Sequence, residues 1–184
     1  MLSSLYTKMH CWWCLTSKER LISAESELLA EQGLQSCKFN IAGMEGCKLR
    51  AVKLGGPEGT EDLPPIVLLH GFGMGLAFWG KQLMEFRKHR QVIAVDLPGS
   101  GTSESWDRIP DLIDEVEDYF ISTLESWREG MAIRRMVLVG HGFGAFVAAV
   151  YSLRHPKRVD QLILVSPVGK ERRGKDEVPL HFAF

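Results

Sequence analysis

The sequence predicts one α/β domain, in which a mostly parallel sheet is flanked by helices. Short and wholly apolar runs recur along the chain, and such runs suit strands that are buried on both faces. Segments with apolar residues at helical spacing separate these runs. A chain that alternates strands and helices in this way builds a parallel sheet with helices on its faces. The length of 184 residues, of which 45% are hydrophobic, is sufficient for such a domain.

The charge balance of the chain argues against nucleic acid as a partner. The chain has 22 basic and 23 acidic residues, so its formal net charge is -1 and no overall basic field exists to hold nucleic acid. The longest apolar runs are far shorter than the roughly 20 residues that span a bilayer, and Met1 to His10 lacks the pattern of a secretory signal. We therefore expect a cytoplasmic protein without a nucleic-acid partner, in which any contact with a membrane is local.

The chain begins with an arm and an amphipathic helix, which we assign to residues 1–33. Thr16 and Glu19 have the spacing of a capping box, in which each side chain satisfies a free backbone N–H at the helix start. Gly33 is a suitable residue for the end of the helix. The apolar residues between these points form one stripe at helical spacing: Leu21, Ala24, Leu28 and Leu29.

Residues 34–169 carry the alternating pattern and are predicted to form the domain. Two β-like segments, Cys37 to Ile41 and Lys48 to Lys53, flank Gly43 to Gly46 and predict a hairpin. The wholly apolar runs predict buried strands at Ile66 to Leu69, Val92 to Val95, Met136 to Val139 and Leu162 to Val165. Helices are expected at Leu76 to Lys88, Leu112 to Glu129 and Phe143 to Arg154. Residues 170–184 are expected to form a charged, solvated tail.

Loops that follow the carboxyl ends of the strands carry the candidate chemistry, because ligands gather at that edge of such a sheet. The run from His70 to Gly75 contains three glycines, which allow a close backbone approach to a ligand or simply build a tight turn. It is not a phosphate-binding P-loop because no Gly-Lys-Ser/Thr follows, and its glycines do not have the spacing of a dinucleotide site. No cofactor is expected.

A strand–turn–helix segment at residues 140–144 has the form of a nucleophile elbow. Its sequence is Gly140-His141-Gly142-Phe143-Gly144, and it follows a predicted strand and precedes a predicted helix, as the G-x-S-x-G motif does. Gly140 and Gly144 leave room for the strand and the helix to approach each other. Gly142, however, stands at the position of the nucleophilic serine, so the segment lacks a reactive atom.

The other parts of a hydrolase triad are also missing from the sequence. A base and an acid that serve the elbow are expected on strands after it, and the chain beyond Val165 holds only a charged segment that includes His181. We therefore predict no catalytic residue. The backbone N–H groups of Phe72 and Phe143 are predicted to form a hole of the oxyanion type, which would hold a carboxylate or a phosphate headgroup.

Other histidines and acids of the domain are interpreted as structural. His70 and Asp96 are expected to fix the loops that follow their strands, and His141 is expected to pack or to form a structural hydrogen bond. His155 and Asp160 have the spacing H-x-x-x-x-D, but Pro156 lies between them, and we interpret the match as coincidence.

The arm contains Cys11-Trp12-Trp13-Cys14, which has the C-x-x-C form of redox and zinc sites. A zinc site would need a second close pair of ligands, which Cys37 and Cys47 do not provide, so no metal site is predicted. Indole rings favour a boundary between apolar and wet phases. We therefore predict that Trp12, Trp13 and Leu15 form a lipid-surface anchor beside the helix, with packing of the rings on the domain as the alternative.

Three blocks together resemble the α/β-hydrolase superfamily: His70-Gly71 before a helix, Asp96 to Ser103 after a strand, and the elbow at Gly140 to Gly144. From Trp12 to Gly169 the chain is also similar to a branch of that superfamily that acts in lipid metabolism. The branch includes a lipid-droplet coactivator of adipose triglyceride lipase and a lysophospholipase for N-acylphosphatidylethanolamines. Among the residues that carry this second resemblance are Glu125-Ser126-Trp127-Arg128 and His155-Pro156.

The resemblance implies an α/β-hydrolase fold that is incomplete at its C-terminal side, because the branch places its histidine and acid further along the chain. It implies a pseudoenzyme of lipid homeostasis, which binds lipid droplets or acyl lipids and regulates a triacylglycerol lipase, since the coactivator also lacks the serine. The expected partners are that lipase, droplet-coat proteins, and the surfaces of droplets, endomembranes or mitochondria.

Two alternatives stay open. The activities of the branch imply a lysophosphatidic acid acyltransferase or a lysophospholipid ester hydrolase. The other alternative is an inert truncated product, because an unprotected last strand at a sheet edge invites aggregation or pairing with a partner.

Overall fold

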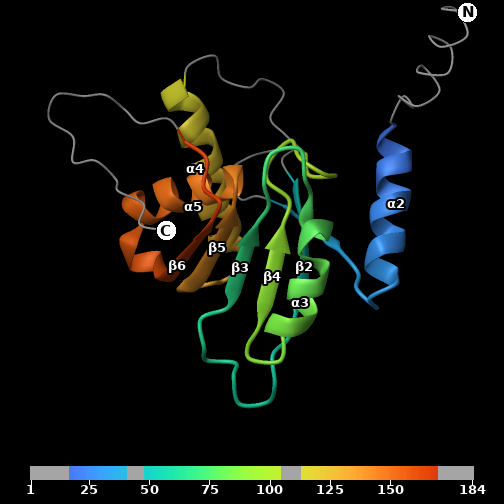
Figure 1. Cartoon of the computed structure of the whole chain (residues 1–184). Coiled ribbons are helices and arrows are strands. Elements are labelled where there is room, and N and C mark those ends of the chain that lie inside the picture. The colour runs from blue at the N-terminus through green and yellow to red at the C-terminus, as the bar shows by residue number, and fades with distance from the viewer. Residues whose placement is uncertain (1–16, 41–47, 105–112, 170–184) are drawn as a thin grey trace, which may run out of the picture.

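The computed structural model of the chain describes residues 17–40, 48–104 and 113–169. Six strands form one sheet in the order β1-β2-β4-β3-β5-β6 (Figure 1). Along the chain they span Cys37–Asn40, Lys48–Leu54, Ile66–Leu69, Val92–Val95, Met136–His141 and Val159–Val165. β3 pairs in parallel with β4 and with β5, and β5 pairs in parallel with β6. Only β1 and β2 run antiparallel to their neighbours in the described sheet, so the prediction of a mostly parallel sheet is confirmed.

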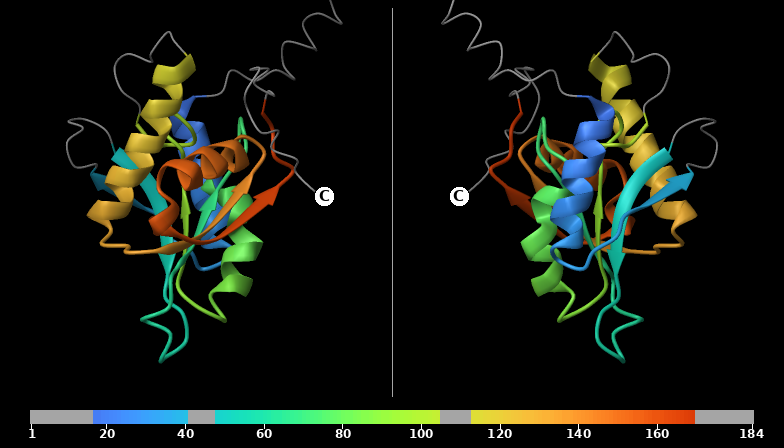
Figure 2. Two further views of the ribbon diagram at one scale, coloured as in Figure 1. Left: turned by 90° about the vertical axis from the view of Figure 1, so that its left-hand side faces the viewer. Right: turned by 90° about the vertical axis from the view of Figure 1, so that its right-hand side faces the viewer.

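Helices cover both faces of this sheet (Figure 2). One face carries α4 (Ile113–Gly130) and α5 (Phe143–Arg154), and the other carries α2 (Lys18–Ala30), the 3-10 turn η1 (Leu76–Trp79) and α3 (Gly80–Phe86). Successive side chains of β3 point to opposite faces of the sheet, as in any pleated strand. Val67 and Leu69 join the apolar core beneath α4 and α5, while Leu68 joins the core beneath α2 and α3.

Several elements have the bounds that the sequence predicts. The strands Ile66–Leu69 and Val92–Val95 and the helix Phe143–Arg154 agree residue for residue. The helix expected over Leu76 to Lys88 differs, because it opens as η1 and continues as α3 only to Phe86. A 3-10 turn is common at the start of a helix. The last strand begins at Val159, three residues before the expected Leu162.

Helix α2 differs from its prediction in two respects. Its N-cap is Ser17, whose Oγ accepts a hydrogen bond from the backbone N–H of Arg20 at 3.3 Å, and Thr16 lies outside the described residues. Of the expected apolar stripe, Leu29 is buried, whereas Leu21 and Leu28 are 40% and 50% exposed. Glu25 and Leu29 are the residues of α2 that are buried. The helix therefore rests on the domain along a narrow strip, and that strip includes a carboxylate.

The run at Leu162 to Val165 was expected to be buried on both faces like the other apolar strands, and this expectation is wrong. Most residues of β6 are exposed, whereas β4 is buried throughout. β6 is the last strand of the described sheet, so it has a neighbour on one side only.

Several predictions fall outside the described residues. These are the anchor formed by Trp12, Trp13 and Leu15, and the tail at residues 170–184. The division of the chain at residues 33 and 169 also stays a prediction. None of the described helices has the length and hydropathy of a membrane span.

Candidate functional site

The elbow forms where β5 runs directly into α5. Gly142 lies between His141, the last residue of β5, and Phe143, the first residue of α5, and has φ 54° and ψ -117°. L-residues rarely adopt a positive φ of this kind, and such strain is typical of functional turns. The backbone of a nucleophile elbow is therefore present, and the residue at its apex is a glycine.

Close packing surrounds the apex on both sides. A Cβ atom at Gly140 would lie 2.3 Å from the carbonyl oxygen of Gly144, and one at Gly144 would lie 2.4 Å from the carbonyl oxygen of His70. Both contacts are with backbone, which cannot move aside as a flexible side chain would. Glycine is thus needed at both positions for α5 to cross the ends of β3 and β5 at this distance.

The apex itself is open. A Cβ atom at Gly142 would meet nothing closer than the Cα atom of Gly71, at 3.6 Å, which is an ordinary van der Waals contact. The loop after β3 therefore faces position 142. Phe72 follows Gly71 in that loop, and Phe143 occupies the first turn of α5, where backbone N–H groups lack partners within the helix. The pairing of these two N–H groups as a hole for an anion stays a prediction.

His70 is engaged by the backbone at both ring nitrogens. Its Nδ1 donates to the carbonyl oxygen of Gly71 at 2.8 Å, and its Nε2 accepts from the N–H of Leu97 at 3.0 Å. This arrangement requires the neutral ring, and burial lowers the pKa of His70 accordingly. The ring ties the end of β3 to the end of β4, as the sequence predicts for a residue that fixes the loops.

Asp96, at the end of β4, holds two turns by hydrogen bonds to its carboxylate. One oxygen accepts from the N–H of Leu76 at the start of η1, and the other accepts from the N–H of Thr102 at 3.2 Å. The bond to Thr102 confirms the predicted role in the glycine-rich turn. The bond to Leu76, which positions η1, was not predicted.

A buried ion cluster joins this carboxylate to distant parts of the chain. Arg50 of β2 forms an ion pair with Glu25 of α2, and its Nη1 lies 3.8 Å from Oδ2 of Asp96. The Nε of Arg50 donates to Oγ of Ser36 at 2.7 Å. The side chains of Glu25, Arg50 and Asp96 are 9%, 5% and 0% exposed, so one guanidinium serves two carboxylates away from water. The cluster fixes α2 against the loops of the site.

Burial raises the pKa of Asp96 to about 6. The hydrogen bonds from Leu76 and Thr102 oppose this rise, the charge of Glu25 adds to it, and the charge of Arg50 opposes it. A carboxylate whose pKa is raised by burial next to a like charge follows the general rule for such groups. Asp96 therefore titrates near neutral pH, although its hydrogen bonds to two turns give it a structural role.

Sequence reasoning missed Glu25 and Arg50. Two signals could have found them. Glu25 stands within the apolar stripe of α2, between Leu21 and Leu29 at intervals of four residues, and Arg50 interrupts the apolar run of a predicted strand. A charge in each of two buried faces indicates a pair, because an isolated buried charge is too costly.

Two further histidines, His141 and His155, contact aromatic rings. The ring of His141 lies against that of Phe78, with centroids 4.9 Å apart, and thus packs as expected. His155 contacts the ring of Tyr151, at 4.9 Å between centroids, and Asp160 pairs with Arg135. The H-x-x-x-x-D spacing therefore gives no common site, in agreement with its interpretation as coincidence.

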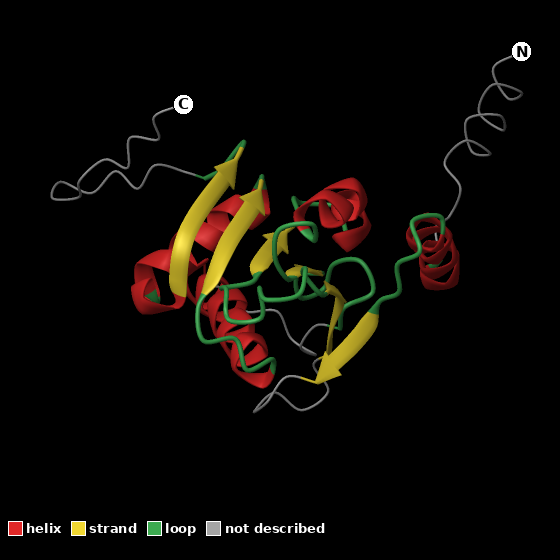
Figure 3. Ribbon diagram, turned by 90° about the horizontal axis from the view of Figure 1, so that it is seen from below, coloured by secondary structure: helices red, strands yellow, loops and turns green. Residues whose placement is uncertain are grey.

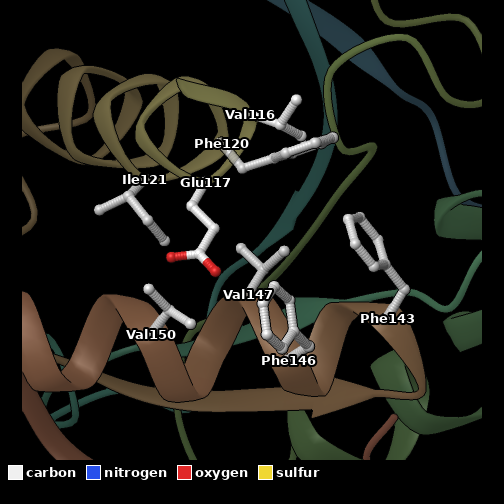
Figure 4. Close-up of a pocket in the computed structure, with 8 residues that line it drawn as sticks. All are labelled: Val116, Glu117, Phe120, Ile121, Phe143, Phe146, Val147 and Val150. Carbon is white, nitrogen blue, oxygen red and sulfur yellow. The ribbon is translucent and has the colours of Figure 1, made fainter. Parts of the chain in front are cut away.

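An apolar cavity of about 240 Å³ opens between α4 and α5, beside the elbow (Figure 4). Its one charged lining residue, Glu117, lies 3.5 Å from Nη2 of Arg154. Phe120 and Phe143 meet edge to face, with ring centroids 5.2 Å apart. The cavity is lined by Val116, Glu117, Phe120, Ile121, Phe143, Phe146, Val147 and Val150.

The described residues hold no group of three histidines, cysteines or acids that could bind a metal ion. Cys37 is a free, exposed thiol. Cys11, Cys14 and Cys47 lie outside the described residues.

Comparison with known proteins places these observations in a family. A family model described as the alpha/beta hydrolase fold matches residues 64–181. The crystal structure of naproxen esterase from Bacillus subtilis superposes with a TM-score of 0.69 at 22% identity, covering 83% of this chain and 51% of that one. At this level of identity the superposition supports the fold alone.

Two curated relatives are similar in sequence. The human protein named 1-acylglycerol-3-phosphate O-acyltransferase ABHD5 is 38% identical over 158 residues, which is 86% of this chain and 44% of that protein. The mouse protein named (lyso)-N-acylphosphatidylethanolamine lipase is 40% identical over 116 residues, which is 63% of this chain and 34% of the lipase. The chain thus matches less than half the length of each relative.

Proposed function

The chain belongs to the α/β-hydrolase-fold family, and from that premise we propose that it is a non-hydrolytic member that binds lipid surfaces or acyl lipids and regulates a triacylglycerol lipase. The observation that carries the proposal is Gly142 at the apex of an intact elbow. A residue without a side chain supplies no nucleophile, and covalent ester hydrolysis on this fold requires one.

The surroundings of the elbow support the same proposal. A triad also needs a base that can take a proton from the nucleophile and a group that orients the base. His70 is buried, and both of its nitrogens are engaged with backbone groups of Gly71 and Leu97. His141 packs on Phe78. His70 is therefore not free to act as the base, because both of its nitrogens are occupied.

Exposed apolar side chains support the lipid-surface part of the proposal. Leu21, Ile22 and Leu28 of α2 are 40%, 41% and 50% exposed, and Phe72 of the neighbouring loop is 89% exposed. A Cβ atom added at Gly75 would meet Oε1 of Glu25, so α2 abuts the loop that carries Phe72. The predicted anchor at Trp12 and Trp13 precedes α2 directly in the sequence. Apolar residues on an amphipathic helix are suited to a lipid interface.

Loss of hydrolysis is tested with the purified chain on p-nitrophenyl butyrate and on a lysophospholipid. We expect no turnover above buffer and no labelling by a fluorophosphonate probe. Gly142→Ser is expected to fold, because the nearest atom to the new Cβ lies at 3.6 Å, and still to lack turnover; Gly142→Ala is its matched control. Turnover by the unmodified chain that the probe abolishes would contradict the proposal. Turnover by Gly142→Ser alone would show that a base is present after all.

Binding to a lipid surface is tested by flotation with triolein droplets coated with phosphatidylcholine. Replacing Trp12 and Trp13 by alanine is expected to lower the floated fraction several-fold, because it removes two interfacial anchors. Leu153→Ala, an exposed apolar position on α5, is the matched control and should leave flotation unchanged. Equal flotation of the tryptophan variant and the unmodified chain would exclude the anchor.

The regulatory part is tested by adding the chain to a triacylglycerol lipase on the same droplets and measuring fatty acid release.

Acyl transfer to 1-acylglycerol-3-phosphate is the second candidate, and it is favoured by the name of the human relative. The assay is formation of phosphatidic acid from acyl-coenzyme A and lysophosphatidic acid by the purified chain. Product above a heat-inactivated control would replace the non-catalytic proposal with this one.

A further inference from the structure

α2 and the turn after it contact the domain at both ends of η1. A Cβ atom at Gly75, just before η1, would lie 2.4 Å from Oε1 of Glu25, and one at Gly80, just after it, would lie 2.6 Å from Oε1 of Gln32. Glycine at both positions therefore leaves the space that these two side chains fill. Viewed from below, α2 lies at the outside of the molecule and leads through a loop into β1 (Figure 3).

The start of η1 is also held by Asp96. Oδ1 of Asp96 accepts a hydrogen bond from the N–H of Leu76, and a Cβ atom at Gly75 would lie 3.3 Å from the same oxygen. Oδ2 of Asp96 accepts from the N–H of Thr102 at 3.2 Å, in the turn after β4. The loop before η1 therefore lies close to two carboxylates, that of Glu25 on α2 and that of Asp96 on the sheet.

Arg50 supplies positive charge to both carboxylates. Its Nη1 pairs with Glu25 and lies 3.8 Å from Oδ2 of Asp96. The backbone of Arg50 is tied to the sheet, because its carbonyl oxygen accepts from the N–H of Asp96 at 2.9 Å and its N–H donates to Oγ of Ser103 at 2.8 Å. Arg50 therefore stays with the sheet if α2 moves away, and the carboxylate that remains beside it is that of Asp96.

The pairing of the guanidinium must then depend on the position of α2, because an unpaired buried charge is costly. With Glu25 in place, Nη1 of Arg50 binds Glu25 directly, and Asp96 keeps its oxygens for the backbone N–H groups of two loops. With Glu25 gone, Oδ2 of Asp96 would have to serve Arg50 and Thr102 together. One cation and two carboxylates thus define two arrangements, which differ in the hydrogen bonds of the loops.

We propose that α2 is a releasable strap, whose docking on η1 changes together with the loops after β3 and β4 as the guanidinium of Arg50 moves from Glu25 to Asp96. In the docked state Asp96 holds the start of η1 and the turn after β4. In the released state Asp96 pairs with Arg50, and its hydrogen bonds to both loops weaken. Gly71, which faces position 142, lies in the loop after β3, so the state of α2 reaches the elbow. The inference goes beyond the proposed function and does not depend on it, because neither a lipid nor a lipase takes part.

Proton binding supports the same two states. The charged or titratable groups next to Asp96 are Glu25 of α2, Arg50 of β2 and His70 of β3, whose Nε2 lies 3.9 Å from Oδ1 and whose pKa is lowered by burial. In the docked state burial raises the pKa of Asp96 to about 6, and the charge of Glu25 adds to the rise. Loss of Glu25 and direct pairing with Arg50 both favour the ionised carboxylate. The docked state therefore binds the proton more tightly, and α2 should be released more readily as the pH rises through about 6.

The coupling is measured by native-state hydrogen exchange of the full chain, which reports local opening at single amides. The amides to follow are Leu29 in α2, Leu76 and Thr102 in the two loops, and Leu138 in β5. Glu25→Gln weakens the pair with Arg50. We expect exchange in α2 and in both loops to rise by a common factor of about ten or more, the loss typical of a hydrogen bond to a charged group, while β5 is unchanged.

Glu27→Gln is the matched control, because it removes the same charge from an exposed position of α2 and should leave both loops unchanged. Faster exchange at Leu29 with no change at Leu76 and Thr102 would overturn the proposal, since the loops would then be independent of α2. An equal rise at Leu138 would also overturn it, because the substitution would then lower the stability of the whole domain rather than release a strap.

The change of partner by Arg50 is tested without any variant by the pH dependence of exchange. After correction for intrinsic exchange rates, opening at Leu29 relative to Leu138 should increase from below to above a pH of about 6. A flat profile would overturn the change of partner. Asp96→Asn should flatten the profile and also reduce the opening of α2 at neutral pH, because no second carboxylate then competes with Glu25. Increased opening of α2 in Asp96→Asn would show that Asp96 only supports the fold, against the proposal.

Discussion

Two buried ion clusters hold the domain together, and they distribute charge in opposite ways. At the edge that carries the elbow, the carboxylates of Glu25 and Asp96 share the guanidinium of Arg50. Between α4 and α5, the carboxylate of Glu125 is shared by donors: Arg128 reaches both of its oxygens at 2.8 Å, and the hydroxyl of Tyr151 donates to it. The first cluster has an excess of acceptors and the second has an excess of donors.

The pKa values follow from this difference. The hydrogen bonds from Arg128 lower the pKa of Glu125 to about 2, against the effect of burial, and Tyr151 lowers it further. At the other cluster, burial raises the pKa of Asp96 to about 6, and the second carboxylate adds to the rise. The same residue chemistry thus gives one carboxylate that stays ionised under all ordinary conditions and one that titrates near neutral pH. Burial is the largest cause of the raised pKa at Asp96, and the hydrogen bonds from Arg128 are the largest cause of the lowered pKa at Glu125.

The largest effect is expected from Arg50→Met, which leaves two buried carboxylates without their cation. Removing one partner of a buried ion pair costs about 3–5 kcal/mol, and the measurement is urea unfolding followed by tryptophan fluorescence. Glu25→Gln in the Arg50→Met background removes one of the orphaned charges and should recover part of the loss. A loss below about 1 kcal/mol, which is typical of exposed ion pairs, would show that water reaches the cluster.

Glu125→Gln is expected to lower the free energy of unfolding by a smaller amount, about 2–3 kcal/mol near neutral pH. The neutral amide accepts weaker hydrogen bonds from the buried guanidinium of Arg128 than the carboxylate does. Its pH dependence has a definite sign. The folded pKa of Glu125 lies below the ordinary value of 4.5, so its stabilisation is full above pH 4.5 and is lost as the pH falls toward 2. Glu125→Gln should lack this acid limb in unfolding curves measured across the range. If Glu125→Gln keeps the acid limb unchanged, other carboxylates cause that limb.

A pH dependence of the opposite sign is expected from Asp96. Its folded pKa of about 6 lies above the ordinary value of 3.8, so the folded state binds the proton more tightly and stability falls as the pH rises between these values. The slope of this fall is at most about 1.4 kcal/mol per pH unit for a single group. The test compares the slope of unfolding free energy against pH with that of Asp96→Asn, which should be flatter whatever its absolute stability. Equal slopes would show that the cluster keeps Asp96 ionised.

Much of this fold could be predicted because its signals are local. The runs at Ile66–Leu69 and Val92–Val95 are apolar for their whole length, and α5 begins directly after the elbow glycine, so pattern and turn chemistry agree on their bounds. The elbow was likewise found from the spacing of Gly140, Gly142 and Gly144. Each of these features depends on neighbours within a few residues.

What could not be predicted depends on contacts between distant segments. Glu25 and Arg50 are 25 residues apart, and although each interrupts an apolar pattern, the local pattern does not show which distant segment it meets. Tertiary packing also decided which face of α2 is buried. The amphipathic pattern predicted that Leu21 and Leu28 are buried, and both are exposed. The apolar composition of β6 predicts a buried strand, but its burial depends on its place at the edge of the described sheet.

The open apex at Gly142 has a consequence for the balance between stability and activity. A serine at φ 54° would carry backbone strain on the order of 1 kcal/mol or more, whereas glycine adopts this conformation freely. Since no neighbouring atom would need to move, that strain is the main structural difference between a reactive and an unreactive apex. Exchanging serine for glycine here relaxes the fold in the same step that removes its chemistry, so a scaffold selected for binding would gain from keeping the glycine.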